Sequence, residues 1–395
     1  MVRWLSLALV WILVGCNAVS RTPLPPQYQT EAQVLGRDDL RHWADQLEQD
    51  NWEQLMAKAE AEQRLEGIRN QSHNYLILSG GGDNGAYGAG LLLGWSARGD
   101  RPRFTMVTGI STGALIAPFA FLGEAYNPAL KELYTTMGSD DIFRQKGLFS
   151  MLGSDALADS TPLAALIESY LDDEMIQALA EAYYQGRTLL IGTTNLDAAR
   201  PVMWNITRIA ATEHPQAPQL IRQLFLASAS LPGLFPPVYV PVTAGDDQRF
   251  DEMHVDGGAT AQLFFYPSQV DWRALERRLG VVGQPQLFLI RNAHLSPSYK
   301  PVDPKIGAIA GKTIDSLIRT QGIGDLYRIA YLAQRDGLGV HASWIPDGVG
   351  SEVEKDEVFD PDYMRVLFDE GFDRAKRGEA WHDLPPQQVK TGSGG

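Results

Sequence analysis

Cysteine is almost absent from this sequence: Cys16 is the only one among 395 residues. A single cysteine cannot form a disulfide within the chain. There is also no Cys/His cluster and no paired acidic motif with the spacing of metal ligands. The short acidic runs, Asp140-Asp141 and Asp172-Asp173-Glu174, are typical of solvated turns or helix caps. The sequence therefore predicts no metal site, and nothing in it calls for a cofactor.

Positive charge is scarce as well. The chain has 34 Lys and Arg against 48 Asp and Glu, a net charge of −14. Nucleic-acid binding depends on clustered Lys and Arg, so no nucleic-acid partner is expected. Electrostatic adhesion to anionic lipid is disfavoured for the same reason. Any membrane attachment must come from an apolar segment, and whether the protein has a protein partner is left open.

The apolar run at the N-terminus is too short to cross a membrane, which takes about 20 residues. It extends from Trp4 to Val14, follows Arg3, and fits the core of a signal peptide. It leads into Leu-Val-Gly-Cys, which resembles the lipobox of bacterial lipoproteins. This resemblance implies cleavage before Cys16 and lipid on that cysteine, and Asn17 in place of Asp favours the outer membrane. We expect a lipid-anchored protein of the bacterial cell envelope, on the periplasmic face of the outer membrane. An ordinary signal peptide followed by an incidental cysteine is the alternative.

The remaining length, with 44% hydrophobic residues, is enough for a substantial core. We expect one large domain without internal repeats. The predicted organisation is a signal peptide over 1–15, a lipidated cysteine and proline-rich tether over 16–36, a helical segment over 37–72, a catalytic domain over 73–382 and a flexible tail over 383–395.

A candidate nucleophile lies in Gly-Ile-Ser-Thr-Gly, residues Gly109 to Gly113. An apolar run, Phe104 to Val107, precedes this motif, and an Ala-rich segment, Ala114 to Leu122, follows it. Strand, sharp turn and helix in this order present a serine in a strained conformation at a helix N-terminus. Ser111 is therefore the predicted nucleophile. The alternative is that Gly-x-Ser-x-Gly occurs here by chance.

A glycine-rich loop precedes that motif by one strand–helix unit. It is Gly-Gly-Gly-Asp-Asn-Gly from Gly80 to Gly85, after a predicted strand, Tyr75 to Leu78, and before a helical run, Ala86 to Trp95. Adjacent glycines leave backbone N–H groups open to an anion, as in an oxyanion hole. The loop also satisfies the Gly-x-Gly-x-x-Gly fingerprint of dinucleotide sites, with Asp100 near the spacing of a ribose-binding acid.

An acidic residue follows a later predicted strand, in His-Val-Asp-Gly-Gly from His254 to Gly258. Asp256 is a candidate catalytic or binding group at the end of that strand, and an ordinary Asp-Gly turn is the alternative. His254, two residues earlier, is expected to point to the same side. A conventional Ser–acid–His triad would need His294, His341 or His382 as its base, although none of them lies in a motif.

The rest of the pattern predicts further helices and strands around these motifs. Residues 126–162 suggest an irregular insertion or a cover over the site. The other segments are a helix over 162–184, strands over 188–194 and 202–209, a helix over 218–229, a strand over 286–291, a helix over 304–335, a strand over 340–345 and a helix over 362–377.

Taken in order, the glycine loop, the Ser111 motif and Asp256-Gly257-Gly258 resemble the patatin-like phospholipase family, and Ala227 to Pro237 looks like its proline-containing block. The resemblance implies a three-layer α/β/α fold with a mainly parallel sheet, a Ser111–Asp256 dyad without histidine, and a lipid acyl ester as substrate. The implied oxyanion-hole residues are Gly80, Gly81, Gly82 and Thr112, and the further motif glycines are Gly85, Gly109, Gly113, Gly257 and Gly258.

Asn84 departs from the family pattern, which usually has Arg or Lys at this position. A neutral amide can form hydrogen bonds but cannot attract a phosphate, so we expect a weaker preference for phospholipid over neutral ester. Two other functions stay open: a non-catalytic envelope lipoprotein that serves as an interaction module, and a dinucleotide-binding protein that uses Gly80 to Gly85.

Overall fold

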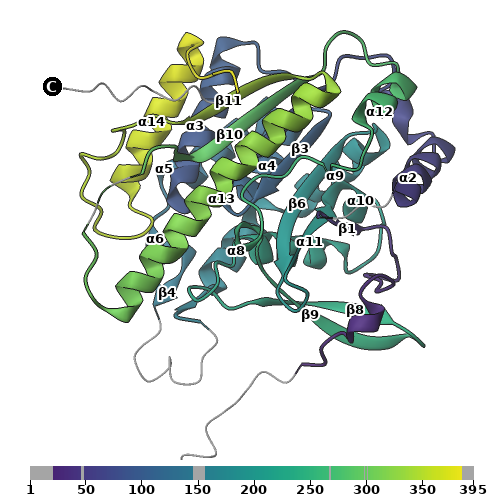
Figure 1. The fold of residues 1–395 in the computed structure, drawn as a ribbon, viewed down its shortest axis with the longest axis horizontal. Helices are drawn as coiled ribbons and strands as arrows, with labels where there is room; N and C mark the ends of the chain where they lie inside the picture. The colour runs from purple at the N-terminus through teal and green to yellow at the C-terminus, as the bar shows by residue number, and fades with distance from the viewer. Residues whose placement is uncertain are drawn as a thin grey trace, which may run out of the picture.

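A mixed sheet forms the centre of the computed structural model, which describes residues 21–45, 49–145, 156–266, 268–297, 299 and 301–384 (Figure 1). In spatial order its strands are β1 (Arg41–Trp43), β7 (Arg200–Asn205), β6 (Thr188–Asn195), β3 (Met106–Ile110), β2 (Asn74–Leu78), β10 (Gln286–His294) and β11 (Gly339–Ile345). From β6 to β11 neighbouring strands run parallel. β1 and β7 are antiparallel additions, and a hairpin of β8 (Val238–Ala244) and β9 (Gln248–Asp256) joins β6 antiparallel.

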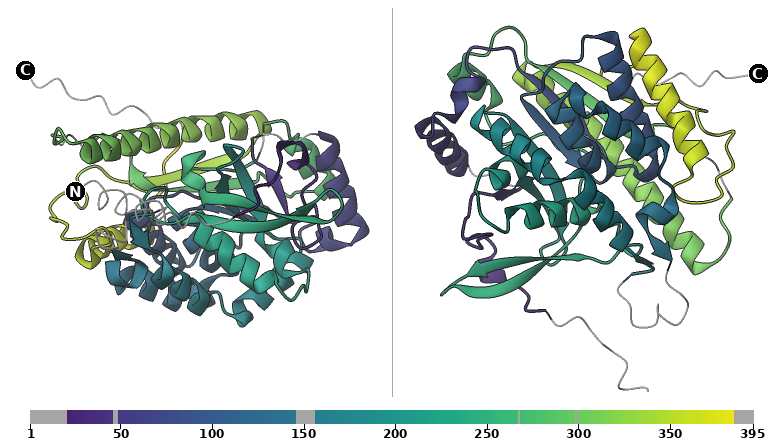
Figure 2. Two further views of the ribbon diagram at one scale, coloured as in Figure 1. Left: turned by 90° about the horizontal axis from the view of Figure 1, so that it is seen from below. Right: turned by 180° about the vertical axis from the view of Figure 1, so that it is seen from behind.

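Helices cover both faces of the sheet, which gives the predicted three-layer α/β/α fold (Figure 2). α13 (Ile306–Asp336) crosses one face, with α12 (Trp272–Leu279) nearby. The other face carries α3 (Gly85–Arg98), α4 (Thr112–Leu122), α5 (Asn127–Thr135), α8 (Thr161–Tyr170), α9 (Asp173–Tyr184), α10 (Ile206–Ala210), α11 (Ala217–Ser228) and α14 (Pro361–Arg377).

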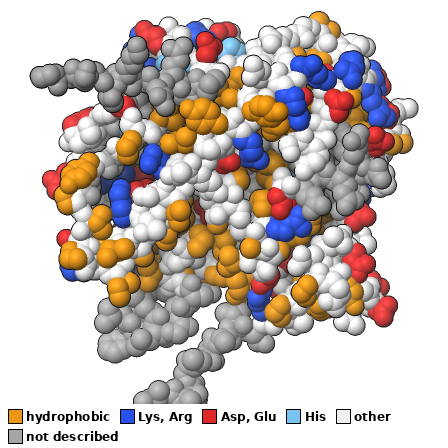
Figure 3. All heavy atoms as spheres, viewed as in Figure 1, with side chains coloured by type: hydrophobic (Ala, Val, Ile, Leu, Met, Phe, Trp, Pro, Cys, Tyr) orange, Lys and Arg blue, Asp and Glu red, His pale blue; other side chains and the backbone are white. Residues whose placement is uncertain are grey.

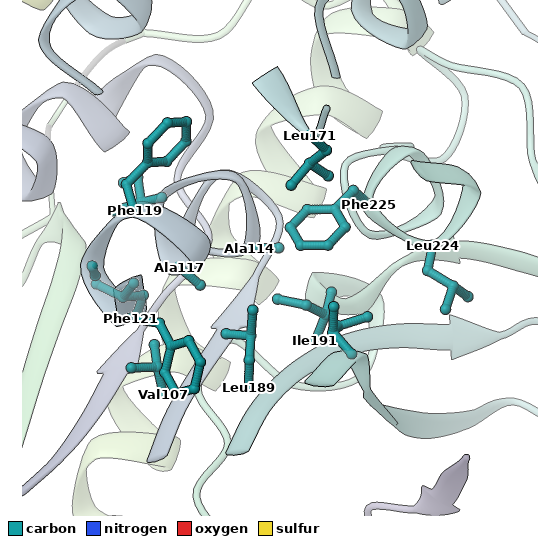
Figure 4. Close-up of a cluster of buried hydrophobic side chains, with 14 of the residues drawn as sticks. Val107, Ala114, Ala117, Phe119, Phe121, Leu171, Leu189, Ile191, Leu224 and Phe225 are labelled. Carbon is teal, nitrogen blue, oxygen red and sulfur yellow. The ribbon is translucent and has the colours of Figure 1, made fainter. Parts of the chain in front are cut away.

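Each face has its own apolar core, because successive side chains of a strand point to opposite faces. In β2, Leu76 and Leu78 belong to the cluster under α3 and α4, whereas Tyr75 and Ile77 belong to the cluster under α13. Figure 4 shows the first cluster around α4, where Ala114 and Ala117 meet Leu189 of β6. This packing holds the start of α4 against the ends of the central strands.

The N-terminal part of the described chain differs from the predicted tether. Residues 21–36 pack along the β8–β9 hairpin: Thr22 and Asp251 pair through the backbone, and Gln33 pairs with Thr243. Leu24 and Val34 are buried in the core. Residues 21–36 therefore form an ordered strap, because Leu24 and Val34 are buried against the rest of the protein.

Two segments that the sequence predicted as single elements are divided in the structure. The expected helix over 162–184 is α8 followed by α9, because the Asp172 side chain accepts from the Met175 N–H and starts a new helix. The expected strand over 202–209 ends at Asn205, whose side chain caps α10 in the same way. The segment 37–72 contains β1, α2 (Gln49–Ala61) and a short 3₁₀ turn, Arg64–Gly67, and so is not wholly helical.

The predicted signal peptide and Cys16 lie outside the described residues, as do residues 385–395 of the predicted tail and residues 146–155 of the insertion. Of the insertion, α5, α6 (Ser139–Ile142) and a short β4 (Arg144–Gln145) and β5 (Ala158–Asp159) pair are described. No helix within the described ranges combines the length and the apolar character needed to cross a membrane.

Candidate active site

Ser111 occupies the sharp turn between β3 and α4. Its backbone has φ 56° and ψ −128°, a conformation that a non-glycine residue adopts only under strain. The turn is tight enough to exclude neighbouring side chains: a Cβ on Gly109 would lie 2.5 Å from the Gly113 carbonyl oxygen, and one on Gly113 would lie 2.4 Å from that of Leu78. The two motif glycines thus permit the turn that presents Ser111.

Asp256 faces Ser111 from the end of β9. β6 brings them together, because its Gly192 pairs with Ile110 of β3 and its Thr193 pairs with Asp256. The Ser111 hydroxyl donates to Asp256 Oδ2 at 2.6 Å, and the Gly258 N–H donates to Oδ1 at 2.7 Å.

The environment of Asp256 makes its carboxylate more basic than usual. The residue is 3% exposed. Burial raises the pKa of Asp256 to about 6, while the hydrogen bonds from Ser111 and Gly258 act to lower it. A carboxylate with this pKa is mostly ionised at neutral pH and is still able to accept a proton, which suits a general base.

The glycine loop follows β2 and is held by the end of β10. Gly81 runs so close to Asn292 that a Cβ would lie 2.1 Å from the Asn292 carbonyl oxygen. The Asn292 side-chain amide donates to the Ser79 carbonyl at 2.9 Å, and its N–H donates to Ser79 Oγ at 2.8 Å. Among the described residues, no acceptor lies within hydrogen-bonding distance of the N–H groups of Gly81, Gly82 or Thr112. These free donors fit an oxyanion hole.

A cavity of about 1020 Å³ opens above these groups. Gly80, Gly81, Gly82, Ser111, Thr112, Asp256 and Gly258 line it. Gly85, Gly109, Gly113 and Gly257 are absent from its lining; a Cβ on Gly85 would collide with the Thr112 side chain, and one on each of the others with a backbone oxygen. One side of the cavity is apolar, with Leu115, Leu163, Leu231, Leu234 and Phe235. The end of β10, the segment after it and α13 contribute Arg291, Ser296, Lys312, Asp315, Ser316 and Arg319, together with the apolar Ala293, Pro297 and Ile318.

Sequence reasoning missed several residues that support the dyad. Ser228 accepts from the Ser111 N–H at 3.1 Å and donates to the Gly192 carbonyl at 2.7 Å, which ties the turn to β6. Tyr134 bonds the Thr112 hydroxyl at 2.6 Å. Ser228 lies in the Ala227 to Pro237 block and had a sequence indication, whereas Tyr134 had none.

His254 points away from the catalytic pair. Its Nδ1 lies 2.9 Å from Thr193 Oγ1 and its Nε2 lies 3.1 Å from Glu252 Oε2. Burial lowers the pKa of His254 against the opposing effect of Glu252, which favours the neutral form of the ring. Glu252 in turn binds Arg41; burial acts to raise the pKa of Glu252, but the guanidinium outweighs it and holds that pKa at about 2. His254, which the sequence predicted as a neighbour of the site, is thus part of a buried structural network with Glu252 and Arg41.

The other histidines have no contact with the dyad. His341 stacks on Phe288 and bonds Gln286, His382 lies against Trp344, and His294 bonds the Pro346 carbonyl at the cavity wall.

Asp100 is not placed to serve as the ribose-binding acid of the alternative dinucleotide site. Asp100 follows the C-terminal end of α3, where it pairs with Arg98. The glycine loop lies at the other end of that helix, about 20 Å away for 14 residues. Asp100 therefore cannot bind a ribose held at the loop.

Positive charge reaches the glycine loop from a distant segment. Lys355, in the loop between β11 and α14, donates to Asp83 Oδ2 at 2.6 Å and lies 3.6 Å from the centre of the Tyr363 ring. Burial raises the pKa of Asp83, and Lys355 acts against that rise. The Tyr363 hydroxyl donates to Asn84 Oδ1 at 2.8 Å. Asn84 itself is neutral, but a cation lies beside it in space.

Comparison with known families agrees with this geometry. Residues 76–266 match the model of the family described as patatin-like phospholipase. This part of the chain is therefore similar to a patatin-like phospholipase domain. The match includes the glycine loop, the Ser111 turn and Asp256.

Comparison with whole proteins adds little to the patatin-like phospholipase assignment. VipD from Legionella pneumophila, a solved structure, is similar to this chain with 12% identity and a TM-score of 0.33. The similarity covers 78% of this chain and 66% of the VipD chain, so this chain spans less than two thirds of its length. No curated protein matches.

Within the described ranges, no group of three or more His, Cys, Asp or Glu side chains is arranged to hold a metal ion.

Proposed function

We propose that the chain hydrolyses carboxylic esters of lipids through an acyl-enzyme, as a phospholipase A or lysophospholipase-like enzyme, with Ser111 as nucleophile and Asp256 as general base. The hydrogen bond of 2.6 Å between Ser111 Oγ and Asp256 Oδ2 carries this proposal. The raised pKa of Asp256 supports it, because the base must gain and lose a proton in each cycle.

The reaction has two halves. Ser111 Oγ attacks the carbonyl carbon of the ester while its proton passes to Asp256, and the C=O electron pair moves onto oxygen. The tetrahedral intermediate then expels the alcohol, which takes the proton from Asp256 and leaves an acyl-serine. In the second half a water molecule gives its proton to Asp256, attacks the acyl-serine, and releases the fatty acid as the proton returns to Ser111.

The glycine loop and the start of α4 supply the proposed oxyanion hole. Gly80 places the loop directly beside the nucleophile, since a Cβ there would lie 3.1 Å from Ser111 Cβ. Gly81, Gly82 and Thr112 line the cavity, and their N–H groups, which have no acceptor among the described residues, are the proposed donors. One such donor typically lowers the barrier by about 2.7 to 4 kcal/mol.

The surroundings of the cavity suit a lipid substrate. Its apolar residues can accommodate an acyl chain, and α13 exposes several apolar side chains on its outer face. Ile306, Ile309 and Leu317 of α13 are 90%, 52% and 65% exposed. On the face that carries α13, apolar side chains lie among basic ones (Figure 3). Such exposed apolar residues are typical of a surface that meets lipid.

We also propose that lipid on Cys16 anchors the protein at the periplasmic face of the outer membrane. Several acyl chains would hold it firmly, since each buried CH₂ contributes about 0.8 kcal/mol. Growth with radioactive palmitate should label the wild type but not Cys16→Ser, and the wild type should fractionate with outer membranes. Equal labelling of both proteins would contradict the lipid anchor.

Three proteins test the catalytic proposal: wild type, Ser111→Ala and Asp256→Asn. Fluorophosphonate labelling and hydrolysis of p-nitrophenyl butyrate should occur in the wild type and disappear in Ser111→Ala with circular dichroism unchanged. A folded wild type that neither labels nor hydrolyses esters would favour the interaction module. Activity that survives Ser111→Ala would exclude the dyad, and binding of a nicotinamide dinucleotide would revive the fingerprint in Gly80 to Gly85.

A further inference from the structure

Arg291 is a buried cation at the wall of the proposed active site. It lies at the end of β10, next to Asn292. Because side chains alternate along a strand, Asn292 reaches the Gly88 N–H of α3, whereas Arg291 lies under α13 and is 2% exposed. Gly322 of α13 makes room for it: a Cβ there would lie 2.0 Å from Arg291 Nη1. The helix is thus shaped to hold a guanidinium at this place.

The guanidinium is poorly satisfied by the protein. Arg291 Nη2 donates to the Arg319 carbonyl at 3.4 Å, and the buried Nε has no partner among the described residues. Asp325, a carboxylate that acts on Arg291 electrostatically, accepts from the Gln262 and Leu263 N–H groups and from Arg328.

Arg291 is nonetheless charged at neutral pH, because burial lowers its pKa only to about 10 and Asp325 acts against that fall. A buried charge with unused donors is costly unless a ligand completes its hydrogen bonds.

The same cavity contains Arg291 and Ser111. β10 lies two strands from β3, which separates their backbones by about 10 Å. The arginine side chain spans part of this distance. The remainder is comparable to the distance between an ester carbonyl and the phosphodiester within one glycerophospholipid. Lys312 and Arg319 of α13 also line the cavity, where Lys312 pairs with Asp315 at 2.9 Å.

We propose that Arg291 is the centre of an anion subsite that binds the phosphodiester of the lipid substrate and directs its acyl chain to the apolar side of the cavity. The proposal rests on the proposed hydrolase function and adds the residue that selects phosphate-bearing lipids over neutral glycerides. A guanidinium suits this role because its planar donors match two phosphate oxygens. The subsite reverses the expectation drawn from Asn84, because the cation comes from β10 rather than from the glycine loop.

Arg291→Met tests the subsite through the ratio of kcat/KM for dioctanoyl phosphatidylglycerol to that for dioctanoylglycerol in one detergent. We expect this ratio to fall about 10- to 100-fold, the usual effect of a lost charge-assisted hydrogen bond. Hydrolysis of p-nitrophenyl butyrate should stay within about threefold, since that ester has no phosphate. Arg291→Lys, which keeps the charge without the fork, should give an intermediate ratio. Arg365→Met is the matched control, because Arg365 pairs with Asp362 on the surface of α14 and does not line the cavity.

Gly322→Ala displaces the guanidinium without removing it and should lower the ratio too, which keeps the test valid if Arg291→Met does not fold. An unchanged ratio in a folded variant of either kind overturns the proposal. The proposal is also overturned if a variant keeps the wild-type ratio and is no longer inhibited by decanoate, because the anion bound at Arg291 would then be the carboxylate of the product. If the wild type hydrolyses no ester, the hydrolase function fails instead. Binding of the two lipids to Ser111→Ala, measured by calorimetry with and without Arg291→Met, then decides the subsite by itself.

Discussion

Asp256→Asn is expected to abolish ester hydrolysis and, at neutral pH, to stabilise the fold. The two effects have one cause. The base is useful because its pKa is high, and its pKa is high because the folded protein buries an anion that water would solvate better. An asparagine has nearly the same shape and no charge, so it removes both the catalytic function and the cost of that burial.

The magnitude follows from the shift in pKa. Burial raises the pKa of Asp256 from 3.8 to about 6, a difference of about 2 units. Each unit corresponds to 1.36 kcal/mol, so the charged carboxylate lowers the free energy of unfolding by about 3 kcal/mol. Because the folded pKa is the higher one, the folded state binds the proton more tightly. The destabilisation is absent below about pH 4, grows between about pH 4 and 6, and is complete above about pH 6.

The assay is urea unfolding of wild type and Asp256→Asn at about pH 4 and about pH 8. Asp256→Asn should gain up to about 3 kcal/mol over the wild type at the higher pH and little at the lower pH. Ser111→Ala is the matched control, because it is equally inactive but keeps the carboxylate. It also loses the hydroxyl that donates to Asp256, so its stability relative to the wild type should fall as the pH rises.

A gain for Asp256→Asn that is the same at both pH values would refute this reasoning, because an uncharged packing effect does not depend on pH. A loss of stability at about pH 8 would refute it more strongly. In that case the hydrogen bonds from Ser111 and Gly258 would hold the carboxylate below its normal pKa.

Three further results are expected. The rate of p-nitrophenyl butyrate hydrolysis should fall below about pH 6 with a single ionisation, since protonated Asp256 cannot act as base. A pH–rate profile in which the rate falls only near pH 4 would contradict this. Gly81→Ala should lower kcat about 100-fold, because the new Cβ must displace a backbone oxygen. Gly82→Ala has open space around its Cβ but a φ of 59°, so it should lower kcat less and reduce stability by about 1 to 2 kcal/mol. Equal losses of kcat in the two variants would argue against the backbone clash. Ser228→Ala should lower kcat about 10-fold with little change in KM, because the Ser111 N–H loses its acceptor; unchanged kcat would show that the turn holds its shape without it.

Local sequence was enough to predict the strand–turn–helix around Ser111 and the loop after β2. Both depend on interactions over a few residues, such as the close approach of Gly109 to Gly113, which only glycine allows. Short apolar runs likewise predicted β2 and β10, whereas the layered fold was expected from the family resemblance. Local sequence did not separate α8 from α9 or β7 from α10, because there a side-chain cap overrides an apolar pattern that continues past it.

The partnership of Ser111 with Asp256 was expected from family resemblance, but only the tertiary structure brings the two side chains within a hydrogen bond. They are separated by 145 positions and meet because β6 pairs with β3 on one side and β9 on the other. The same is true of the groups that the sequence missed. Asn292 holds the glycine loop, Lys355 brings charge beside Asn84, and Arg291 lies under a glycine of α13. The sequence by itself determined the reactive groups and their local turns; their mutual distances and the burial that tunes Asp256 depend on long-range packing, which no short motif encodes.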